Sequence, residues 1–146
     1  MRATLVLLAV VGVALVAAAD ASARVTCTPG LTPGGRTYCG PAKATLKVGG
    51  KKYLFRGGNC KLSSGAWLLN IGTITLAGKP QHRYLGITVF KGKPGRHSAA
   101  VSWQLPGKTK SLRNAYVTLA RGLKKGTFTG SVFPVGGKAS GSFTCR

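Results

Sequence analysis

The stretch AAVSWQL, residues 99–105, alternates apolar and polar side chains with a period of two. Successive side chains of a β-strand point to opposite faces, so the pattern predicts a strand with one buried face. The apolar set is Ala99, Val101, Trp103 and Leu105, and the set expected to face water is Ser102 and Gln104. One apolar and one polar face are typical of antiparallel sheets. The stretch therefore predicts an all-β fold.

The same alternation recurs along the chain between turns rich in Gly, Pro, Lys and Asn. The runs are ATLKV and KYLF at 44–48 and 52–55, AWLLNIGTITL at 66–76, YLGITVF at 84–90, AYVTL at 115–119, GTFTGSVF at 126–133 and ASGSFTC at 139–145. We expect a hairpin turning at Gly49-Gly50 and a bulge at Gly72-Thr73, where the alternation changes phase. These runs predict an antiparallel β-sandwich of about seven to nine short strands, with a small β-barrel as the alternative.

The beginning of the chain is typical of a secretory signal peptide. Arg2 precedes an apolar run at residues 5–19, and Ala21-Ser22-Ala23 fits a small-residue cleavage site. The run is shorter than the roughly 20 residues that span a bilayer. We therefore expect a signal peptide at 1–23, a Gly/Pro-rich N-terminal arm at 24–43 and a β-sandwich domain at 44–146. The protein is then secreted, extracellular or associated with the cell envelope, with no transmembrane span after cleavage.

Charge is the most unusual property of the sequence. The chain has 22 Lys and Arg and one acidic residue, for a net charge of +21. That acid, Asp20, lies inside the expected signal peptide, so residues 24–146 contain no Asp or Glu. An average domain is about 25% charged, with both signs present. So strong a positive field attracts polyanions such as nucleic acid, anionic lipid or an acidic wall polymer.

The lack of carboxylates also excludes several kinds of site. Glycosidases need a pair of carboxyl groups, and a Ser-His-Asp triad needs its acid. Calcium and magnesium sites are normally built from carboxylates, so we expect no cofactor and no metal. The chemistry that remains possible is a metal-free ribonuclease in which His82 and His97 act as base and acid. Both histidines adjoin arginines in the basic segments QHRY and GRHS, which favours exposed imidazoles and a protein that is not an enzyme.

Four cysteines in an exported chain predict two disulfides. Three pairings are possible, and we favour Cys27–Cys39 and Cys60–Cys145. The first closes a loop rich in Pro and Gly, and the second joins the start of the domain to its last strand. Zinc is the competing use of the cysteines, but the close Cys-x2–4-Cys spacing of zinc sites is missing.

The ordered segments GGNC, WLLNIGTITL, YLGITVF, AYVTLARGLKKGTFTG and GKASGSFTC resemble small exported actinobacterial envelope proteins. They are similar to the lipoprotein antigen family of mycobacterial envelopes, which shares a Cys after glycines, a strand ending in Ile-Gly and a closing Gly-x-Phe-x-Cys. The resemblance covers residues 44–146. The chain departs from that family because it has no lipid-attachment cysteine and no acids in this region. The resemblance implies an envelope or extracellular protein that is not an enzyme, and it indicates no site residues.

Basic residues concentrate in turns and at strand edges, where a rigid scaffold usually presents binding groups. The candidate polyanion-binding residues are Lys51, Lys52, Lys91, Lys93, Arg96, Lys108, Lys110, Arg113, Arg121, Lys124 and Lys125. The sequence thus predicts a protein that binds wall polymer, nucleic acid or another anionic surface non-specifically. The alternative is a structural envelope protein whose charge has no specific ligand, since edge lysines also prevent aggregation.

Overall fold

The computed structural model describes residues 27–146, so the expected signal peptide and its cleavage site lie outside the described residues. All regular structure in 27–146 is β, and no helix occurs there. The strands are β1 (Gly30–Thr32), β2 (Gly35–Tyr38), β3 (Lys43–Val48), β4 (Lys51–Arg56), β5 (Gly58–Ser63), β6 (Ala66–Thr75), β7 (Tyr84–Val89), β8 (Gly95–Leu105), β9 (Lys108–Leu119), β10 (Lys125–Phe133) and β11 (Lys138–Thr144).

The strands form one antiparallel sheet in the order β1-β2-β6-β7-β8-β9-β10-β11-β3-β4, with β5 also paired to β6. The sheet does not close, because β1 and β4 are its ends. The all-β antiparallel prediction is confirmed, and so is the hairpin at Gly49-Gly50, where Val48 pairs with Lys51. The described part of the chain has more strands than expected because β1, β2 and β5 lack a clear apolar alternation.

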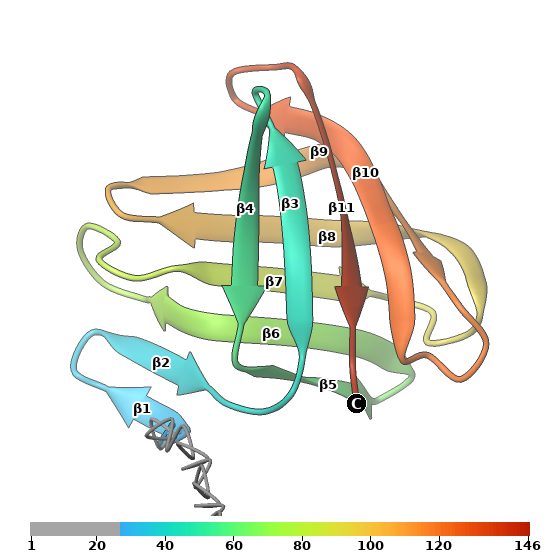
Figure 1. Ribbon diagram of the computed structural model, residues 1–146, viewed down its shortest axis with the longest axis horizontal. Helices are drawn as coiled ribbons and strands as arrows, with labels where there is room; N and C mark the ends of the chain where they lie inside the picture. Colours follow the sequence, from blue (N-terminus) through green and yellow to red (C-terminus); the bar gives the residue numbers. More distant parts are fainter. Residues whose placement is uncertain (1–26) are drawn as a thin grey trace, which may run out of the picture.

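The sheet bends back on itself into two layers. In Figure 1, β3, β4, β10 and β11 run crosswise over β6, β7 and β8. The corner lies in β8 and β9, whose ladder shifts register between Ser98 and Ser102, while the β9–β10 ladder shifts between Thr129 and Ser131. Both shifts leave an extra residue in β9 near Asn114, which has a φ of 50°. This β-bulge bends the strand, so the sandwich is built from the two halves of a single sheet.

The core lies between the two layers. Its largest fully buried side chains are Trp67, Phe143, Leu46, Leu69, Ile71, Leu85, Ile87, Leu119, Val89, Val101 and Val117. These residues come from both layers and follow the predicted alternation. In the aromatic pair at one side of the core, the rings of Trp67 and Phe143 lie 4.8 Å apart, and Trp67 Nε1 donates a hydrogen bond to the Leu123 carbonyl oxygen at 3.1 Å.

Gln104 corrects one detail of the prediction, because it is buried and does not face water. Its side-chain Nε2 donates to the Thr75 carbonyl oxygen at 3.0 Å, and its Oε1 accepts from the Thr75 N–H at 2.7 Å. β7 begins at Tyr84, opposite Gln104, so no strand lies between β6 and β8 at Thr75. The amide of Gln104 therefore satisfies backbone groups that a longer β7 would otherwise pair.

The N-terminal arm is part of the sheet. β5 pairs with β6 from Ala66 to Ile71, and β2 continues along the same strand from Gly72 to Thr75. The expected bulge at Gly72-Thr73 is wrong, because the β2–β6 ladder crosses this point without a register shift and the β6–β7 ladder ends in register at Gly72. Gly72 instead has a φ of 86°, and a Cβ there would meet the Arg83 carbonyl oxygen. The change in pattern thus marks the position where β6 exchanges one partner strand for another.

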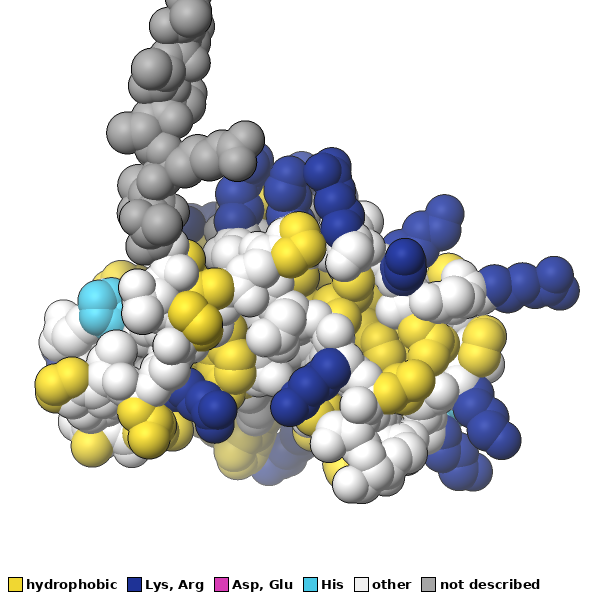
Figure 2. Space-filling model, turned by 90° about the horizontal axis from the view of Figure 1, so that it is seen from below, with side chains coloured by type: hydrophobic (Ala, Val, Ile, Leu, Met, Phe, Trp, Pro, Cys, Tyr) yellow, Lys and Arg dark blue, Asp and Glu magenta, His cyan; other side chains and the backbone are white. Residues whose placement is uncertain are grey.

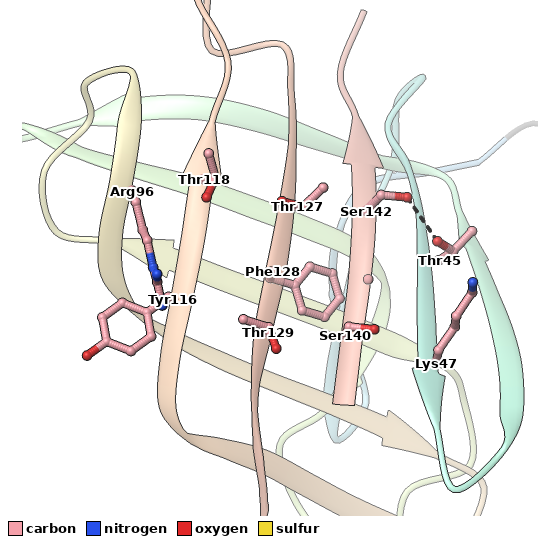
Figure 3. A pocket seen from close by; sticks show the side chains of 11 residues that line it. Thr45, Lys47, Arg96, Tyr116, Thr118, Thr127, Phe128, Thr129, Ser140 and Ser142 are labelled. Atoms are coloured by element: carbon pink, nitrogen blue, oxygen red, sulfur yellow. Dashed lines mark hydrogen bonds between the residues drawn. The ribbon is translucent and has the colours of Figure 1, made fainter. Parts of the chain in front are cut away.

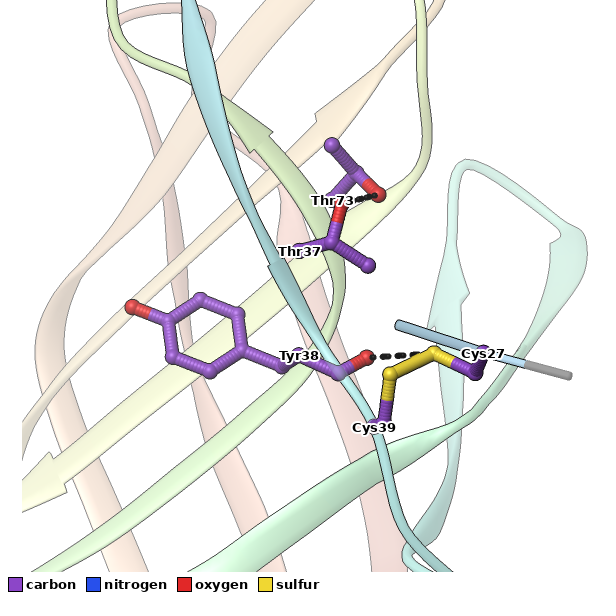
Figure 4. The surroundings of a disulfide bond; sticks show 5 residues. All are labelled: Cys27, Thr37, Tyr38, Cys39 and Thr73. Carbon is purple, nitrogen blue, oxygen red and sulfur yellow. Dashed lines mark hydrogen bonds between the residues drawn. A yellow bond between two sulfur atoms is a disulfide. The ribbon is translucent and has the colours of Figure 1, made fainter. Parts of the chain in front are cut away.

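Both predicted disulfides are present. Cys60–Cys145 joins β5 to the residue after β11, and both cysteines pack against the core. Cys27–Cys39 holds the beginning of the described chain to the end of β2, and Cys27 Sγ lies 3.6 Å from the Tyr38 carbonyl oxygen (Figure 4). The hydroxyl of Thr37 on β2 is hydrogen-bonded to that of Thr73 on β6 at 3.0 Å, and this bond links the two strands. No free cysteine remains among residues 27–146.

Candidate functional site: the hydroxyl groove

The predicted basic residues do not form one site. Lys91 and Lys93 lie in the β7–β8 loop, while Arg121 and Lys124 lie in the β9–β10 turn. The Arg113 guanidinium stacks on Phe133, with Cζ 3.9 Å from the ring centroid. Figure 2 shows Lys and Arg side chains standing out around the face that is seen from below, with apolar side chains between them.

A distinct arrangement occurs on the outer face of the layer formed by the first half of β8, the second half of β9, and β10, β11 and β3. Six Ser and Thr side chains line a groove of about 510 Å³ there. The residues of this hydroxyl groove are Thr45, Thr118, Thr127, Thr129, Ser140 and Ser142. They come from the neighbouring strands β9, β10, β11 and β3, as Figure 3 shows. The groove is thus a surface of hydroxyl groups, which both donate and accept hydrogen bonds.

Strand register places these hydroxyls in two rows across the sheet. One row runs Arg96, Thr118, Thr127, Ser142, Thr45. The other runs Ser98, Tyr116, Thr129, Ser140, Lys47. Within the first row, the hydroxyls of Thr45 and Ser142 are hydrogen-bonded to each other at 3.1 Å. Each row therefore has a cation at one end, Arg96 on β8 or Lys47 on β3.

Cations on β3 and β4 face each other across the strand pair beside the groove. Lys47 lies directly opposite Lys52, and Lys43 lies directly opposite Arg56. All four side chains are exposed. Like charges directly opposite one another in a sheet are destabilising. Because residues 27–146 contain no carboxylate side chain, no acidic neighbour in the described chain offsets this repulsion.

Arg96 and Tyr116 form the other end of the groove. The Arg96 Cζ lies 4.3 Å from the centre of the Tyr116 ring, a cation–π contact between neighbouring strands. This contact orders a long side chain and keeps its guanidinium beside the hydroxyls, as Figure 3 shows. A guanidinium in a fixed orientation suits bidentate binding of carboxylate, sulfate or phosphate.

The floor of the groove is shaped by Phe128, which is buried, and by Gly141, its register partner on β11. A Cβ at Gly141 would meet both the Phe128 ring and the Thr45 carbonyl oxygen. The reverse pair, Gly126 with Phe143, lies two residues away on the same face of this ladder. Each ring fills the space that its partner glycine leaves, so β10 and β11 can pair closely beneath the outer hydroxyls.

Some of the predicted cations belong to this face, and others do not. Lys52, Arg96 and Lys125 lie on it, whereas Lys51, Lys108 and Lys110 meet at one end of the sandwich. The sequence analysis missed Lys47 and the six hydroxyl residues. A signal for them was present, because Thr-x-Thr at 127–129 and Ser-x-Ser at 140–142 place hydroxyls on one face of a strand.

The two histidines are far apart, which does not fit the ribonuclease alternative. His82 comes just before Tyr84, which is opposite Gln104 at one end of β8, whereas His97 lies near the other end of that strand. At roughly 3.3 Å per residue, the strand from Gln104 to His97 is about 23 Å long. His97 Nε2 also lies 2.8 Å from the Lys93 carbonyl oxygen, within its own loop. One phosphodiester cannot contact both imidazoles.

Two further findings apply to residues 27–146. No group of three or more His, Cys, Asp or Glu side chains that could hold a metal ion occurs in this range. None of the described segments is a helix long and apolar enough to cross a membrane.

Comparisons with known proteins add no assignment. No family model matches the chain, and searches of curated proteins and of solved structures find no significant match. The resemblance to envelope lipoprotein antigens therefore stays a prediction.

Proposed function

We propose that this is an extracellular or envelope-associated protein, not an enzyme, that binds an anionic polymer along the hydroxyl groove. The two disulfides and the absence of a membrane-spanning helix from residues 27–146 are compatible with a location outside the cytoplasm. The observation that carries the proposal is the pair of hydroxyl rows, each with a cation at one end.

The dimensions of the face favour a polymer over a single small anion. Arg96 on β8 and Lys47 on β3 are separated by β9, β10 and β11, which is about 19 Å at roughly 4.8 Å per strand. A ligand that reaches both cations must carry anionic groups over that length. Between them, the Ser and Thr hydroxyls offer hydrogen bonds to the neutral oxygens of the same chain. An acidic or sulfated polysaccharide has both kinds of group.

The opposed cations on β3 and β4 support the same proposal. The Lys47–Lys52 and Lys43–Arg56 pairs repel each other in the free protein. An anionic chain lying over them neutralises both pairs, so its binding removes an unfavourable interaction as well as adding favourable ones. This gives the face an advantage over isolated lysines elsewhere on the surface.

The proposal is tested by titrating the protein with heparin, teichoic acid and duplex DNA at about 50 mM and about 200 mM salt. We expect binding that weakens as salt rises, because counterions are released from the polymer. The variant Lys47→Gln/Lys52→Gln should bind more weakly than the matched control Lys61→Gln/Lys79→Gln, which has the same net charge. A third double variant, Lys91→Gln/Lys93→Gln, tests the β7–β8 loop in the same way.

Equal losses in all three variants would show that only net charge matters, as for a charged coat without a specific ligand. Absence of binding to all three polymers at the lower salt concentration would overturn the proposal.

A further inference from the structure

A second site lies at the end of the sandwich where three hairpins meet. The β3–β4, β8–β9 and β10–β11 turns surround a pocket of about 540 Å³. Figure 1 shows the β3–β4 and β10–β11 turns next to each other at the top of the molecule. This volume falls within the roughly 300–1,000 Å³ that is typical of sites for small ligands.

The walls of this pocket are apolar and belong to both layers. Trp103 of β8 and Val132 of β10 line it and are members of the buried core. Val48, Tyr53 and Leu105, which are partly buried against that core, also line it, as does the exposed Val135. The pocket is therefore an apolar depression at the end of the sandwich, and side chains of the packed core form its floor. An aliphatic chain lying in it would cover these apolar walls.

The rim of the pocket is cationic. It carries Lys51, Lys108, Lys110 and Lys138, which come from all three hairpins. Three of these lysines are register partners of wall residues: Lys51 of Val48, Lys108 of Leu105 and Lys110 of Trp103. The ammonium groups thus stand beside the apolar walls, and residues 27–146 provide no carboxylate side chain to pair with them.

Two pairs of glycines, in the β3–β4 and β10–β11 turns, form the mouth of the pocket. Gly49-Gly50 and Gly136-Gly137 line the mouth, all with positive φ between 56° and 87°. No atom lies within 4 Å of the position that a Cβ would take at any of these four glycines. The tight turns therefore leave the entrance open between the lysines.

We propose that this lysine-rimmed pocket binds a medium- or long-chain fatty acid, with the acyl chain along the apolar walls and the carboxylate at the rim. An anionic polymer would not need the apolar walls, and a neutral apolar ligand would not need four lysines. A single-chain anionic amphiphile uses both features. This inference is independent of the hydroxyl groove, which faces outward from the opposite surface of the β3–β11–β10 layer.

Trp103 supplies the readout. Dodecanoate, kept below its micelle concentration, is titrated while tryptophan fluorescence is followed. We expect a saturable change that neither butyrate, which lacks the chain, nor dodecyltrimethylammonium, which has the opposite charge, produces. The rim variant Lys108→Gln/Lys110→Gln should weaken dodecanoate binding about fivefold or more. The matched variant Lys91→Gln/Lys93→Gln should not.

Three results would overturn the inference: no saturable change with dodecanoate, equal binding of dodecyltrimethylammonium, or unchanged binding by a folded Lys108→Gln/Lys110→Gln protein. The groove variant Lys47→Gln/Lys52→Gln should bind dodecanoate like the wild type, so the two sites are tested separately.

Discussion

Lys47 of β3 lies directly opposite Lys52 of β4 on the outer face of the sheet, and both side chains are exposed. Neighbouring like charges destabilise a strand pair, and here no carboxylate side chain in residues 27–146 compensates. A ligand that neutralises the two lysines would give this destabilising pair a function. This relationship leads to opposite expectations for stability and for binding.

The variant Lys52→Glu should be more stable than the wild type and bind anionic polymer less well. It replaces a repulsive cross-strand pair with an attractive one, a gain of about 0.2–1 kcal/mol that shrinks as salt rises. Urea denaturation at low and high salt measures the gain, and a heparin titration measures the loss. Lys61→Glu on β5 is the control. If both substitutions raise stability equally, the effect reflects net charge and not the Lys47–Lys52 pair.

Gly141→Ala should destabilise the protein by about 1–3 kcal/mol, because its Cβ would overlap the Phe128 ring and the Thr45 carbonyl oxygen. The exposed neighbour Ser140→Ala should change the free energy of unfolding much less. Thermal or urea denaturation of both variants tests this. Equal stability of Gly141→Ala and wild type would show that the Phe128–Gly141 pair does not hold β10 and β11 together as described.

The two disulfides should contribute unequally to stability. Cys60–Cys145 has a sequence separation of 85, and closing so long a loop stabilises by about 4–5 kcal/mol in the chain-entropy model. Cys27–Cys39 has a separation of 12, which corresponds to about 3 kcal/mol, and it holds only the edge hairpin. Replacing Cys60 and Cys145 with Ala should therefore lower the melting temperature more than replacing Cys27 and Cys39.

Low salt should make the loss of Cys60–Cys145 more severe, and added sulfate should partly restore folding by screening charge and favouring burial. An unchanged melting temperature for the Cys60→Ala/Cys145→Ala variant would contradict this account of how the fold withstands its own charge.

The Tyr84 phenol should lose its proton at a higher pH than an ordinary tyrosine. Burial, and to a smaller extent the nearby Tyr38, raises the pKa of Tyr84 from 10.0 to about 12. The neutral phenol donates a hydrogen bond to Asn70 Oδ1 at 2.6 Å. In the unfolded chain the Tyr84 phenol ionises at a lower pH than in the folded protein. The contribution of the neutral phenol to folding stability is therefore complete below pH 10 and is lost as the pH rises towards about 12.

The difference between the tyrosinate absorbance of the wild type and that of Tyr84→Phe isolates this group. In the folded protein its midpoint should lie near pH 12, and in denaturant near pH 10. A midpoint near 10 in the folded protein would mean that the Tyr84 phenol is not shielded from water as the structure indicates.

Alternation along the sequence was enough to predict the core and the fold class. Leu85, Ile87 and Val89 are buried on one face as expected, and so are Val101 and Trp103. Both disulfides also followed from composition and spacing. These features depend on local pattern, which a single strand already contains.

Features that depend on the neighbours of a strand were not predicted. The sequence pattern places Gln104 on the surface, because it does not show that the short β7 leaves the N–H and carbonyl of Thr75 without a strand partner on that side. Leu112 and Ala115 are both buried only because the bulge in β9 shifts the alternation between them.

The hydroxyl groove is a further example. Its rows join residues from Thr45 to Ser142, and these come together only through the strand order β9-β10-β11-β3. The sequence indicates that each strand has hydroxyls on one face, but not that the strands are adjacent.

Amide chemical-shift mapping with a short heparin fragment tests the central claim most directly. If the polymer binds along the hydroxyl groove, the largest shifts should follow its two rows, from Arg96 to Thr45 and from Tyr116 to Lys47, and should weaken as salt rises. Shifts spread evenly over all basic segments, or largest in the Lys91–Lys93 loop, would contradict binding at the groove.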